Sequence, residues 1–337
     1  IWLSRNSKNW SLEFPITPSV QEPISAKVKN KVIQERQKKT FNRYKTAKVA
    51  SILSKRCGLI NKGNTCYVNV LLQSLSVCSD LWSSSDLSSS PLSSSLNRLL
   101  CLLRSNSSPL DPSVFLISLK DAFIKAGKSS FEVNAQHDVV EILEFILDDF
   151  ANSSIIFKES FAIRSVTRVT CHSCLEMNIW EDNLNILRLP VMKDISSALN
   201  NMLESESLLD TNAPFRNVCA SIKDSDSKVS ITSVGRCVII QLNRFIVSDG
   251  VILKNSAPVV CSPNIEIVTV LENEVFCSRK FQLSAIINHS GNLERGHYTC
   301  LIRDRETWWH CNDRAVVHSK PEDIDPTLPY LLFYTTI

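Results

Sequence analysis

The chain has no hydrophobic run close to the roughly 18 apolar residues that a membrane-spanning helix needs. Its first residues, Ile1-Trp2-Leu3-Ser4-Arg5, lack the charged-then-apolar layout of a secretory signal peptide. They also lack an initiator Met, which is typical of a fragment or a processed product. With 44% hydrophobic residues in 337 and a mean hydropathy near zero, the composition predicts a soluble protein with a large core and no membrane contact.

A dense cysteine framework is also absent. Twelve cysteines are spread over the whole chain, unlike the closely spaced cysteines of small disulfide-linked secreted domains. We therefore expect reduced thiols and an intracellular protein, in the cytoplasm or the nucleus. No internal repeat is visible.

Charge is distributed unevenly. Residues 1–25 contain three prolines and no periodic pattern, as expected of an extension or linker. Between residues 26 and 56, eleven Lys and Arg accompany the single Glu35, so this basic arm carries +10 and the rest of the chain −7. The arm is expected to be a solvated helix or mobile segment, or to bind an acidic partner or a nucleic acid. An acidic body favours encounter with a basic substrate segment.

The order of predicted elements indicates an α+β fold. Helices are expected over 96–104, 113–125 and 138–150, the last with an apolar stripe from Val139 to Phe150. The serine-rich stretch 83–95 is expected to be a flexible loop between two helices. Beyond residue 160 the pattern changes to short β-type runs.

Cys66 lies where a polar, glycine-containing loop runs into a helical pattern. Val68, Leu71, Leu72 and Leu75 follow it at helical spacing, and Asn64 or Thr65 is a plausible N-cap. A cysteine at the start of a helix is favoured as thiolate, because the unpaired N–H groups and the helix dipole stabilise negative charge there. The alternative is a small buried cysteine without chemistry.

A histidine far along the chain favours a reactive Cys66 thiol over a buried cysteine without chemistry. His297 lies in Gly296-His297-Tyr298-Thr299-Cys300, and Asn312 and Asp313 follow Trp308-Trp309 downstream. A thiol hydrolase uses such an ordered set: the histidine moves the proton and a third residue orients the imidazole. These residues predict thiol-dependent hydrolysis.

The same residues resemble a known family, the ubiquitin-specific proteases. Residues 58–69 resemble its cysteine box, and residues 287–299 resemble its histidine box. Weaker blocks at 134–141, 238–245 and 330–334 are similar to other family blocks in the same order. The resemblance implies a papain-like cysteine protease fold with thumb, palm and shortened fingers. It also implies a catalytic domain over 57–337 after an N-terminal extension over 1–56.

The resemblance implies roles for individual residues. Cys66 is the nucleophile, His297 the base, and Asn61, five residues before Cys66, the side-chain donor to the oxyanion. Asn312 matches the orienting position, and Asp313 is the alternative that assists or replaces it. The family block around 136–141 makes Gln136 and Asp138 candidates for holding the tail of ubiquitin, although Asp138 could be only a helix cap. Gly296 and Tyr298 are expected to line the narrow cleft for the tail's two glycines.

The substrate implied by the resemblance is ubiquitin or a ubiquitinated protein, cleaved after the C-terminal glycine of ubiquitin at an isopeptide or peptide bond. Two alternatives stay open: a non-catalytic ubiquitin-binding module, and a protease for another ubiquitin-like modifier. The intact set of catalytic residues argues against the first. Departures from the family pattern at His137 and Val139 permit the second.

No catalytic metal or cofactor is expected. Many family members hold a structural zinc ion with two Cys-x-x-Cys pairs, and Cys171 and Cys174 match the first pair. Where the second pair should fall, Cys219 stands alone, and a closed zinc site needs four ligands. Cys171, Cys174 and Cys219 with His172 could still form a site, but the missing pair argues against zinc.

Overall fold

A computed structural model describes residues 56–78, 90–128, 131–152, 154–248, 250–270, 276–292 and 295–337. The basic arm, apart from Arg56, lies outside the described residues. The chain divides into two units. The larger unit comprises Lys55–Ile246 and Lys254–Ile337. The described part of the other is Val247–Leu253, which covers most of a two-stranded hairpin formed by β9 (Phe245–Ser248) and β10 (Val251–Lys254).

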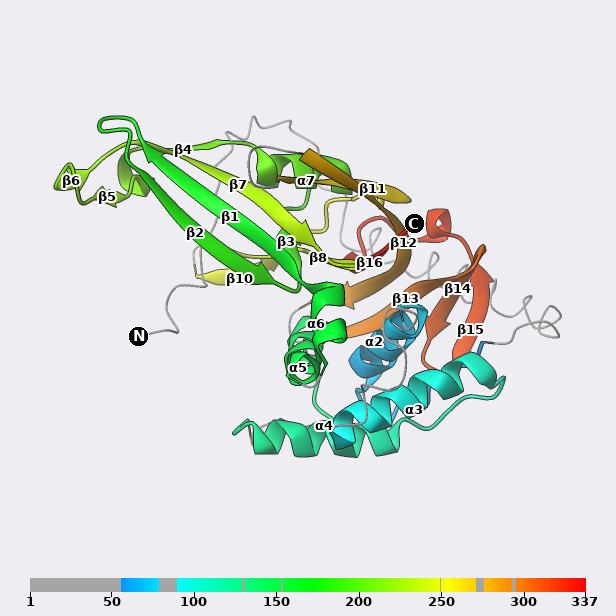
Figure 1. The fold of residues 1–337 in the computed structure, drawn as a ribbon. Helices are drawn as coiled ribbons and strands as arrows, with labels where there is room; N and C mark the ends of the chain where they lie inside the picture. Colours follow the sequence, from blue (N-terminus) through cyan, green and yellow to red (C-terminus); the bar gives the residue numbers. More distant parts are fainter. Residues whose placement is uncertain are drawn as a thin grey trace. The chain divides into compact units, whose positions relative to one another are not determined.

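Helices dominate the first half of the larger unit (Figure 1). The α-helices are α2 (Cys66–Val77), α3 (Pro91–Ser105), α4 (Ser113–Lys125), α5 (Val139–Ala151), α6 (Ile155–Phe161) and α7 (Ile195–Leu203). Two 3₁₀ turns are η3 (Asp210–Asn212) and η5 (Pro321–Asp323). Among the described helices, none is long and apolar enough to cross a membrane.

Strands follow the helices, as the sequence pattern predicts, except that α7, which was not predicted, lies between β3 and β4. They are β1 (Ile163–Cys171), β2 (Met177–Leu184), β3 (Leu187–Leu189), β4 (Glu206–Leu208), β5 (Phe215–Arg216), β6 (Ser221–Ile222), β7 (Ser225–Val234), β8 (Cys237–Leu242), β11 (Asn264–Val270), β12 (Phe276–Gly291), β13 (Gly296–Asp304), β14 (Thr307–Asn312), β15 (Ala315–Ser319) and β16 (Pro329–Thr336).

The largest sheet separates two apolar layers. Its strand order is β15-β14-β13-β12-β16-β8-β3, with β11 also paired to β12, and of these pairs only β3–β8 is parallel. Alternate residues of one strand point to opposite faces. Thus Leu331 and Phe333 of β16 pack in the cluster that contains α2 to α5, whereas Leu332 and Tyr334 pack in the cluster that contains α7. Helix α2 contacts β13 and β12 on the first face.

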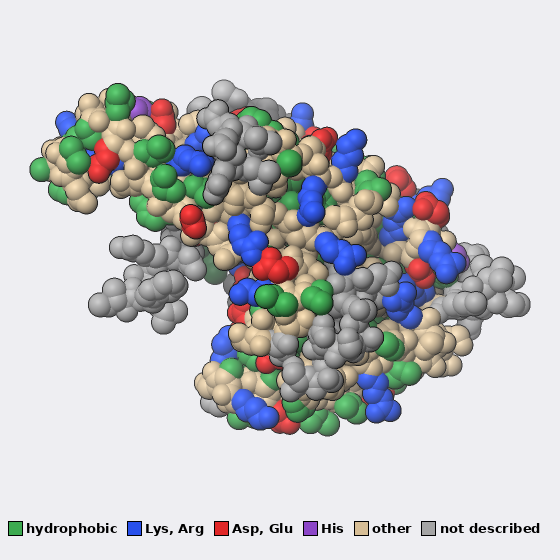
Figure 2. Space-filling view, viewed as in Figure 1, with side chains coloured by type: hydrophobic (Ala, Val, Ile, Leu, Met, Phe, Trp, Pro, Cys, Tyr) green, Lys and Arg blue, Asp and Glu red, His purple; other side chains and the backbone are tan. Residues whose placement is uncertain are grey.

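A second sheet of four strands has the order β2-β1-β7-β4. Strand β2 is an edge strand, and none of its residues is buried. The small hairpin β5–β6 lies near the end of this sheet (Figure 1). Hydrophobic side chains are exposed on that end (Figure 2).

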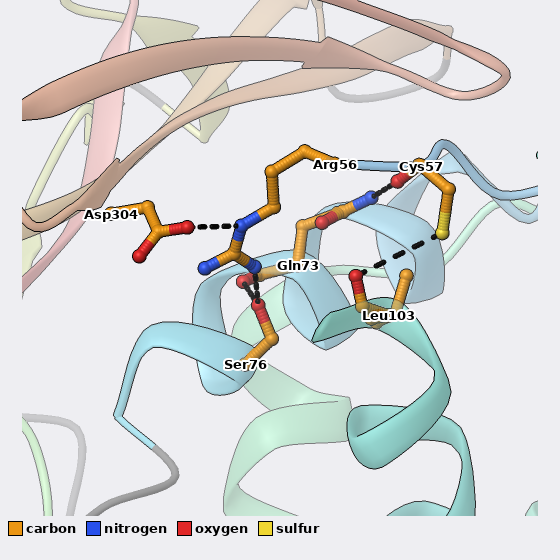
Figure 3. A network of polar contacts seen from close by, with 6 residues as sticks. All are labelled: Arg56, Cys57, Gln73, Ser76, Leu103 and Asp304. Atoms are coloured by element: carbon orange, nitrogen blue, oxygen red, sulfur yellow. Dashed lines mark hydrogen bonds and ion pairs between the residues drawn. The ribbon is translucent and has the colours of Figure 1, made fainter. Parts of the chain in front are cut away.

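Arg56, the last residue of the basic arm, is packed against the helical part. Its side chain is 6% exposed; Nε donates to Asp304 Oδ2 at 3.0 Å and Nη1 donates to Ser76 Oγ at 3.0 Å (Figure 3). Beside it, Gln73 Nε2 donates to the carbonyl oxygen of Cys57 at 2.8 Å. These contacts fix the chain onto α2 ten residues before Cys66. The boundary at residues 56 and 57 stays a prediction.

The expected loop over 83–95 is wrong at its C-terminal end. Residues 79–89 lie outside the described part of the chain, but α3 begins at Pro91, five residues before the predicted start. The cause is a strong start signal. Ser90 and Ser93 form a reciprocal capping box, Pro91 stands in the first turn, and Leu92 continues the buried stripe.

Candidate active site

Cys66 is the first residue of α2, and its side chain lines a cleft. Thr65 occupies the N-cap position but makes no side-chain cap, so the predicted cap is wrong for Thr65. Its hydroxyl instead accepts from the backbone N–H of Lys62 at 2.9 Å and donates to Asn61 Oδ1 at 3.2 Å. The loop thus uses this side chain to hold its own turn. The first N–H groups of α2 have no partner within the helix, an arrangement that favours negative charge at its start.

His297 and Asn312 lie at the same end of neighbouring strands. His297 is the second residue of β13 and Asn312 is the last of β14, and His297 Nε2 lies 2.8 Å from Asn312 Oδ1. An amide oxygen only accepts, so Nε2 carries the proton in this arrangement. Hydrogen bonding with the Cys66 thiol, the largest effect, raises the pKa of His297 to about 9 against the opposing effect of burial. An imidazolium is therefore favoured beside the sulfur.

Asp313 has a different set of partners from Asn312. Its Oδ2 accepts from Asn61 Nδ2 at 3.0 Å, and its Oδ1 accepts from Asn69 Nδ2 at 2.7 Å. Asn61 precedes the nucleophile and Asn69 lies in the first turn of α2, so one carboxylate joins both sides of Cys66 to the sheet. The geometry separates the two alternatives for the third residue: Asn312 contacts His297, and Asp313 holds the loop that bears Asn61.

Gly58 permits the close approach that makes these contacts possible. A Cβ atom at this position would lie 2.4 Å from the carbonyl oxygens of both Asp313 and Arg314. The next residue, Leu59, donates its N–H to Asp313 O at 2.9 Å. Only a residue without a side chain allows the segment before the cysteine loop to lie on the turn after β14.

The cleft brings together the residues predicted to bind the substrate tail. Gln136, Asp138, Gly296 and Tyr298 all line it together with Cys66. The other lining residues, which the sequence analysis did not assign to tail binding, are Asn64, Tyr67, His137, Phe245, His289 and Asn292. They come from several separate segments, so their proximity has no local signal in the sequence.

One hydrogen bond joins the two walls of the cleft. Gln136 Oε1, before α5, accepts from the backbone N–H of Gly296 at 3.1 Å. Asn64, beside the nucleophile, donates through Nδ2 to Asn134 O at 2.8 Å. The loop before α5 is therefore tied both to β13 and to the cysteine loop.

Asp138 caps α5 as the sequence analysis considered. Its Oδ1 accepts from the backbone N–H of Val140 at 2.9 Å. Its Oδ2 accepts from the hydroxyl of Tyr330 in β16 at 2.7 Å, and that hydroxyl also accepts from Gln241 Nε2 at 3.0 Å. Both carboxylate oxygens thus have partners within the protein, and binding of the substrate by Asp138 stays a prediction.

His289 is buried directly under Gly296. A Cβ atom on Gly296 would lie 2.1 Å from His289 Nε2, so glycine is required here. Burial lowers the pKa of His289 to about 4, and nearby Lys254 contributes. Lys254 Nζ lies 3.1 Å from His289 Nδ1 and donates to the carbonyl oxygens of His289 and Gly291. A neutral imidazole therefore forms part of the floor of the cleft.

Three cysteines that do not line the cleft lie together at the end of the four-stranded sheet. The sulfur atoms of Cys171, Cys174 and Cys219 all lie within 4.8 Å of one another. His172, the fourth ligand considered in the sequence analysis, has its Nε2 3.1 Å from Asp226 Oδ1. Among the described residues, the three thiols are one fewer than the four ligands of a closed zinc site, and the absence of zinc stays a prediction.

The cleft geometry can perform acyl transfer. It combines a thiol at a helix start, an imidazole beside it, an amide oxygen that orients the imidazole, and a nearby side-chain amide at Asn61. Asn61 Nδ2 has two hydrogens, and Asp313 is its one acceptor among the described residues, so the second hydrogen can serve a developing oxyanion.

Known sequences agree with this chemistry. The sequence profile of the family described as ubiquitin carboxyl-terminal hydrolase matches residues 57–334. Ubiquitin carboxyl-terminal hydrolase 16 of Arabidopsis thaliana is 24% identical over 311 residues, 82% of this chain and 30% of that protein. Ubiquitin carboxyl-terminal hydrolase 11 of Schizosaccharomyces pombe is 29% identical over 285 residues, 78% of this chain and 79% of that protein. The chain thus spans less than a third of the plant relative.

Solved structures agree with the fold. The chain resembles a chain of the SAGA Ubp8/Sgf11/Sus1/Sgf73 DUB module bound to ubiquitin aldehyde, with a TM-score of 0.68 and 20% identity over 85% of this chain and 71% of that one. The predicted α+β, papain-like fold is confirmed. Because the family profile covers most of the chain, from Cys57 to Tyr334, this protein belongs to the ubiquitin carboxyl-terminal hydrolase family.

Proposed function

We propose that the chain is a cysteine-type deubiquitinase that hydrolyses the isopeptide or peptide bond after the C-terminal glycine of ubiquitin. The observation that carries this proposal is the arrangement at one end of the cleft. Cys66 begins α2, His297 is hydrogen-bonded to it, and Asn312 Oδ1 lies 2.8 Å from the other ring nitrogen. Family membership and the ubiquitin aldehyde bound in the related DUB module support ubiquitin as the substrate.

In the first half of the reaction, the Cys66 sulfur attacks the carbonyl carbon of the terminal glycine. The tetrahedral oxyanion accepts hydrogen bonds from the backbone N–H of Cys66 and from the free Nδ2 hydrogen of Asn61. The imidazolium of His297 then delivers its proton to the leaving amine, and the C–N bond breaks. A thioester between Cys66 and ubiquitin remains.

In the second half, water attacks the thioester carbonyl while neutral His297 takes its proton. The C–S bond breaks, which restores the Cys66 thiolate beside the His297 imidazolium, and the released carboxylic acid of ubiquitin gives its proton to solvent and leaves as a carboxylate. Asn312 orients the ring in both halves, but as a neutral amide it stabilises the imidazolium less than a carboxylate does. The His297–Cys66 pair supplies the proton that moves, so no step requires a further acid.

Recognition of the substrate is proposed to depend on the narrow part of the cleft. Gly296 cannot carry a side chain because His289 lies beneath it, which leaves room for a chain of similarly small residues above it. Gln136 Oε1 accepts the Gly296 N–H in the free protein. A backbone amide of the ubiquitin tail would compete for this acceptor, and Tyr298 would pack against the tail.

The test uses the full chain and ubiquitin that carries a thiol-reactive group in place of its C-terminal carboxylate. A stable adduct is expected with the unmodified chain and not with Cys66→Ala. Cys101→Ala is the matched control, because Cys101 is an exposed thiol on α3 and its loss should leave labelling unchanged. Turnover is then measured with a fluorogenic ubiquitin amide.

The outcomes separate the alternatives. An adduct with another ubiquitin-like probe, and none with ubiquitin, would replace the substrate in this proposal. Binding of ubiquitin without any adduct by a folded chain would indicate a non-catalytic binding module. An adduct that persists in Cys66→Ala would refute the assignment of the nucleophile.

A further inference from the structure

Two turns with the same residue spacing lie at the end of the four-stranded sheet; we call them the finger tip, residues 171–176 and 215–222. In the first turn the N–H of Cys171 donates to Glu176 O, five residues later, at 3.0 Å, and Leu175 has a φ of 58°. In the second turn Arg216 pairs with the residue five positions later in β6, and Ala220 has a φ of 50°. The two turns thus share spacing and the position of the left-handed residue.

We call the two positions that lie three residues apart in each turn, 171 and 174 or 216 and 219, its corners. Cys174 stands three residues after Cys171, and Cys219 stands three residues after Arg216. The sulfur atoms of Cys171 and Cys219 are 3.9 Å apart. Two such turns offer four equivalent corners, of which three carry thiols and the fourth carries Arg216.

Arg216 links the two turns directly. Its Nη2 donates to Glu176 O at 2.6 Å, the same oxygen that accepts from Cys171. The Glu176 carboxylate lies 3.5 Å from Nη2. The Arg216 side chain is 0% exposed, and its Nε and Nη1 have no hydrogen-bond partner within the described part of the chain.

The finger tip has no apolar core that could hold the two turns together. Its large hydrophobic side chains are more than 60% exposed, and they gather at the end of the sheet that carries β5 and β6 (Figure 2): Leu175, Phe215, Val218 and Ile222. The fully buried side chains among these residues are those of Cys171 and Arg216. A segment of this kind usually needs a metal ion or a disulfide to stay folded.

We propose that Arg216 replaces a structural metal ion in the finger tip, so that the two turns are joined by its guanidinium and the three thiols hold no resident zinc. A guanidinium is always protonated and has no lone pair to offer, so it cannot act as the fourth ligand. This inference does not depend on the proposed deubiquitinase activity.

The first test measures metal in the unmodified full chain. The protein is produced in zinc-supplemented medium, purified without chelator, and analysed for zinc by mass spectrometry alongside thermal unfolding with and without EDTA. We expect far less than one zinc ion per chain and the same Tm in both buffers. One zinc ion per chain that is lost in Cys219→Ser would overturn the proposal.

The second test asks whether Arg216 has the structural role. Arg216→Met keeps the length of the side chain and removes its charge and donors, and a fall in Tm of about 3–8 °C is expected whether or not chelator is present. Arg98→Met, an exposed position on α3, is the control and should leave Tm unchanged. An unchanged Tm in Arg216→Met would contradict the linking role.

The third test converts the fourth corner back to a thiol. Arg216→Cys completes four cysteines, so this variant should bind about one zinc ion per chain and acquire a Tm that falls when EDTA is added. This gain does not require Arg216→Met to fold. Failure of folded Arg216→Cys to take up zinc would show that Arg216 does not occupy the fourth ligand position.

Discussion

Replacement of Asp313 tests how the nucleophile is held. The carboxylate accepts two amide hydrogen bonds, from Asn61 at 3.0 Å and from Asn69 at 2.7 Å, and Asn69 is 2% exposed. A hydrogen bond to a charged group contributes about 1.5–3 kcal/mol to the free energy of unfolding. The contributions of neighbouring groups are not additive. Asp313→Gly should therefore destabilise the protein by about 3 kcal/mol.

Backbone conformation distinguishes the possible replacements. Asp313 has a φ of 50°, where alanine costs about 1 kcal/mol more than glycine and asparagine is tolerated. Asp313→Ala should therefore destabilise by about 4 kcal/mol. Asp313→Asn should cost only about 1–2 kcal/mol, because Asn69 Oδ1 has no partner among the described residues and can turn to accept from the new amide. The destabilisation is therefore expected to increase from Asp313→Asn through Asp313→Gly to Asp313→Ala.

The assay is urea unfolding followed by tryptophan fluorescence, with a common slope fitted to all variants. Asp182→Asn, an exposed carboxylate of β2, is the control. Three variants that each lie within about 0.5 kcal/mol of the unmodified protein would refute the role of the hydrogen bonds. If Asp313→Ala destabilises the protein no more than Asp313→Gly, the argument from the positive φ of Asp313 is wrong. On a ubiquitin amide, kcat should fall more than KM rises, because Asn61 loses the partner that fixes its amide.

Three further predictions concern the cleft. Cys66→Ala removes the main cause of the raised pKa of His297, so an NMR titration should find this ring near its ordinary value of about 6.5 instead of about 9. A raised pKa of His297 adds stability that is complete below about pH 6.5 and is lost as the pH rises through 9. The unmodified chain should therefore lose more stability than Cys66→Ala between these two pH values. Equal slopes of the free energy of unfolding against pH, measured by urea unfolding, would contradict this. Gly58→Ala places a Cβ 2.4 Å from two carbonyl oxygens, so it should lower the free energy of unfolding by about 2–3 kcal/mol or prevent folding. A loss below about 0.5 kcal/mol would show that the turn after β14 can move. Tyr330→Phe should lower the free energy of unfolding by about 1–2 kcal/mol, because the 2.7 Å hydrogen bond to Asp138 is lost. Asp138→Ala should lower it by about 1 kcal/mol more, because the helix cap is lost as well. If the two losses add in the double variant, the hydrogen bond between the two side chains contributes nothing.

The sequence was sufficient to find Cys66 and His297 because each lies in a motif of consecutive residues. It also ordered the fold correctly, since helical periodicity before residue 160 and short β-type runs after it are local properties. The family assignment that follows from the two motifs is confirmed by the profile match over residues 57–334. The roles of the individual residues stay predictions.

The missed features depend on contacts between distant segments. Asp313 lies 252 positions from Asn61 and 244 from Asn69, and no periodicity links them. Asn312 was predicted to orient His297, but the choice between it and Asp313 depended on the pairing of β13 with β14. The start of α3 was within reach, because Ser90, Pro91 and Ser93 form a capping signal. Serine content outweighed that signal in the sequence analysis.

Arg216 shows a different limit of sequence reasoning. A search for cysteine pairs finds Cys219 alone, because the residue at the matching position is not a cysteine. The common spacing of the two turns becomes visible only from the left-handed residues Leu175 and Ala220 and from the strand pairing that closes each turn. A substitution that preserves a turn while changing its chemistry leaves no motif to detect.

The candidate site is assembled at the seam between the helical and the strand-rich halves, and this has a consequence for its stability. Cys66 begins a helix, whereas His297 and Asn312 lie at strand ends, so their geometry depends on how the halves are joined. Hydrogen bonds from the Gly296 N–H to Gln136 Oε1, and from Asn61 in the cysteine loop to Asp313 Oδ2, join them at the cleft. Partial separation of the halves would disperse the nucleophile and the base before either half unfolds. Activity should therefore be lost at lower urea concentrations than tryptophan fluorescence or helical circular dichroism, and coincident transitions would show that the seam opens only with global unfolding.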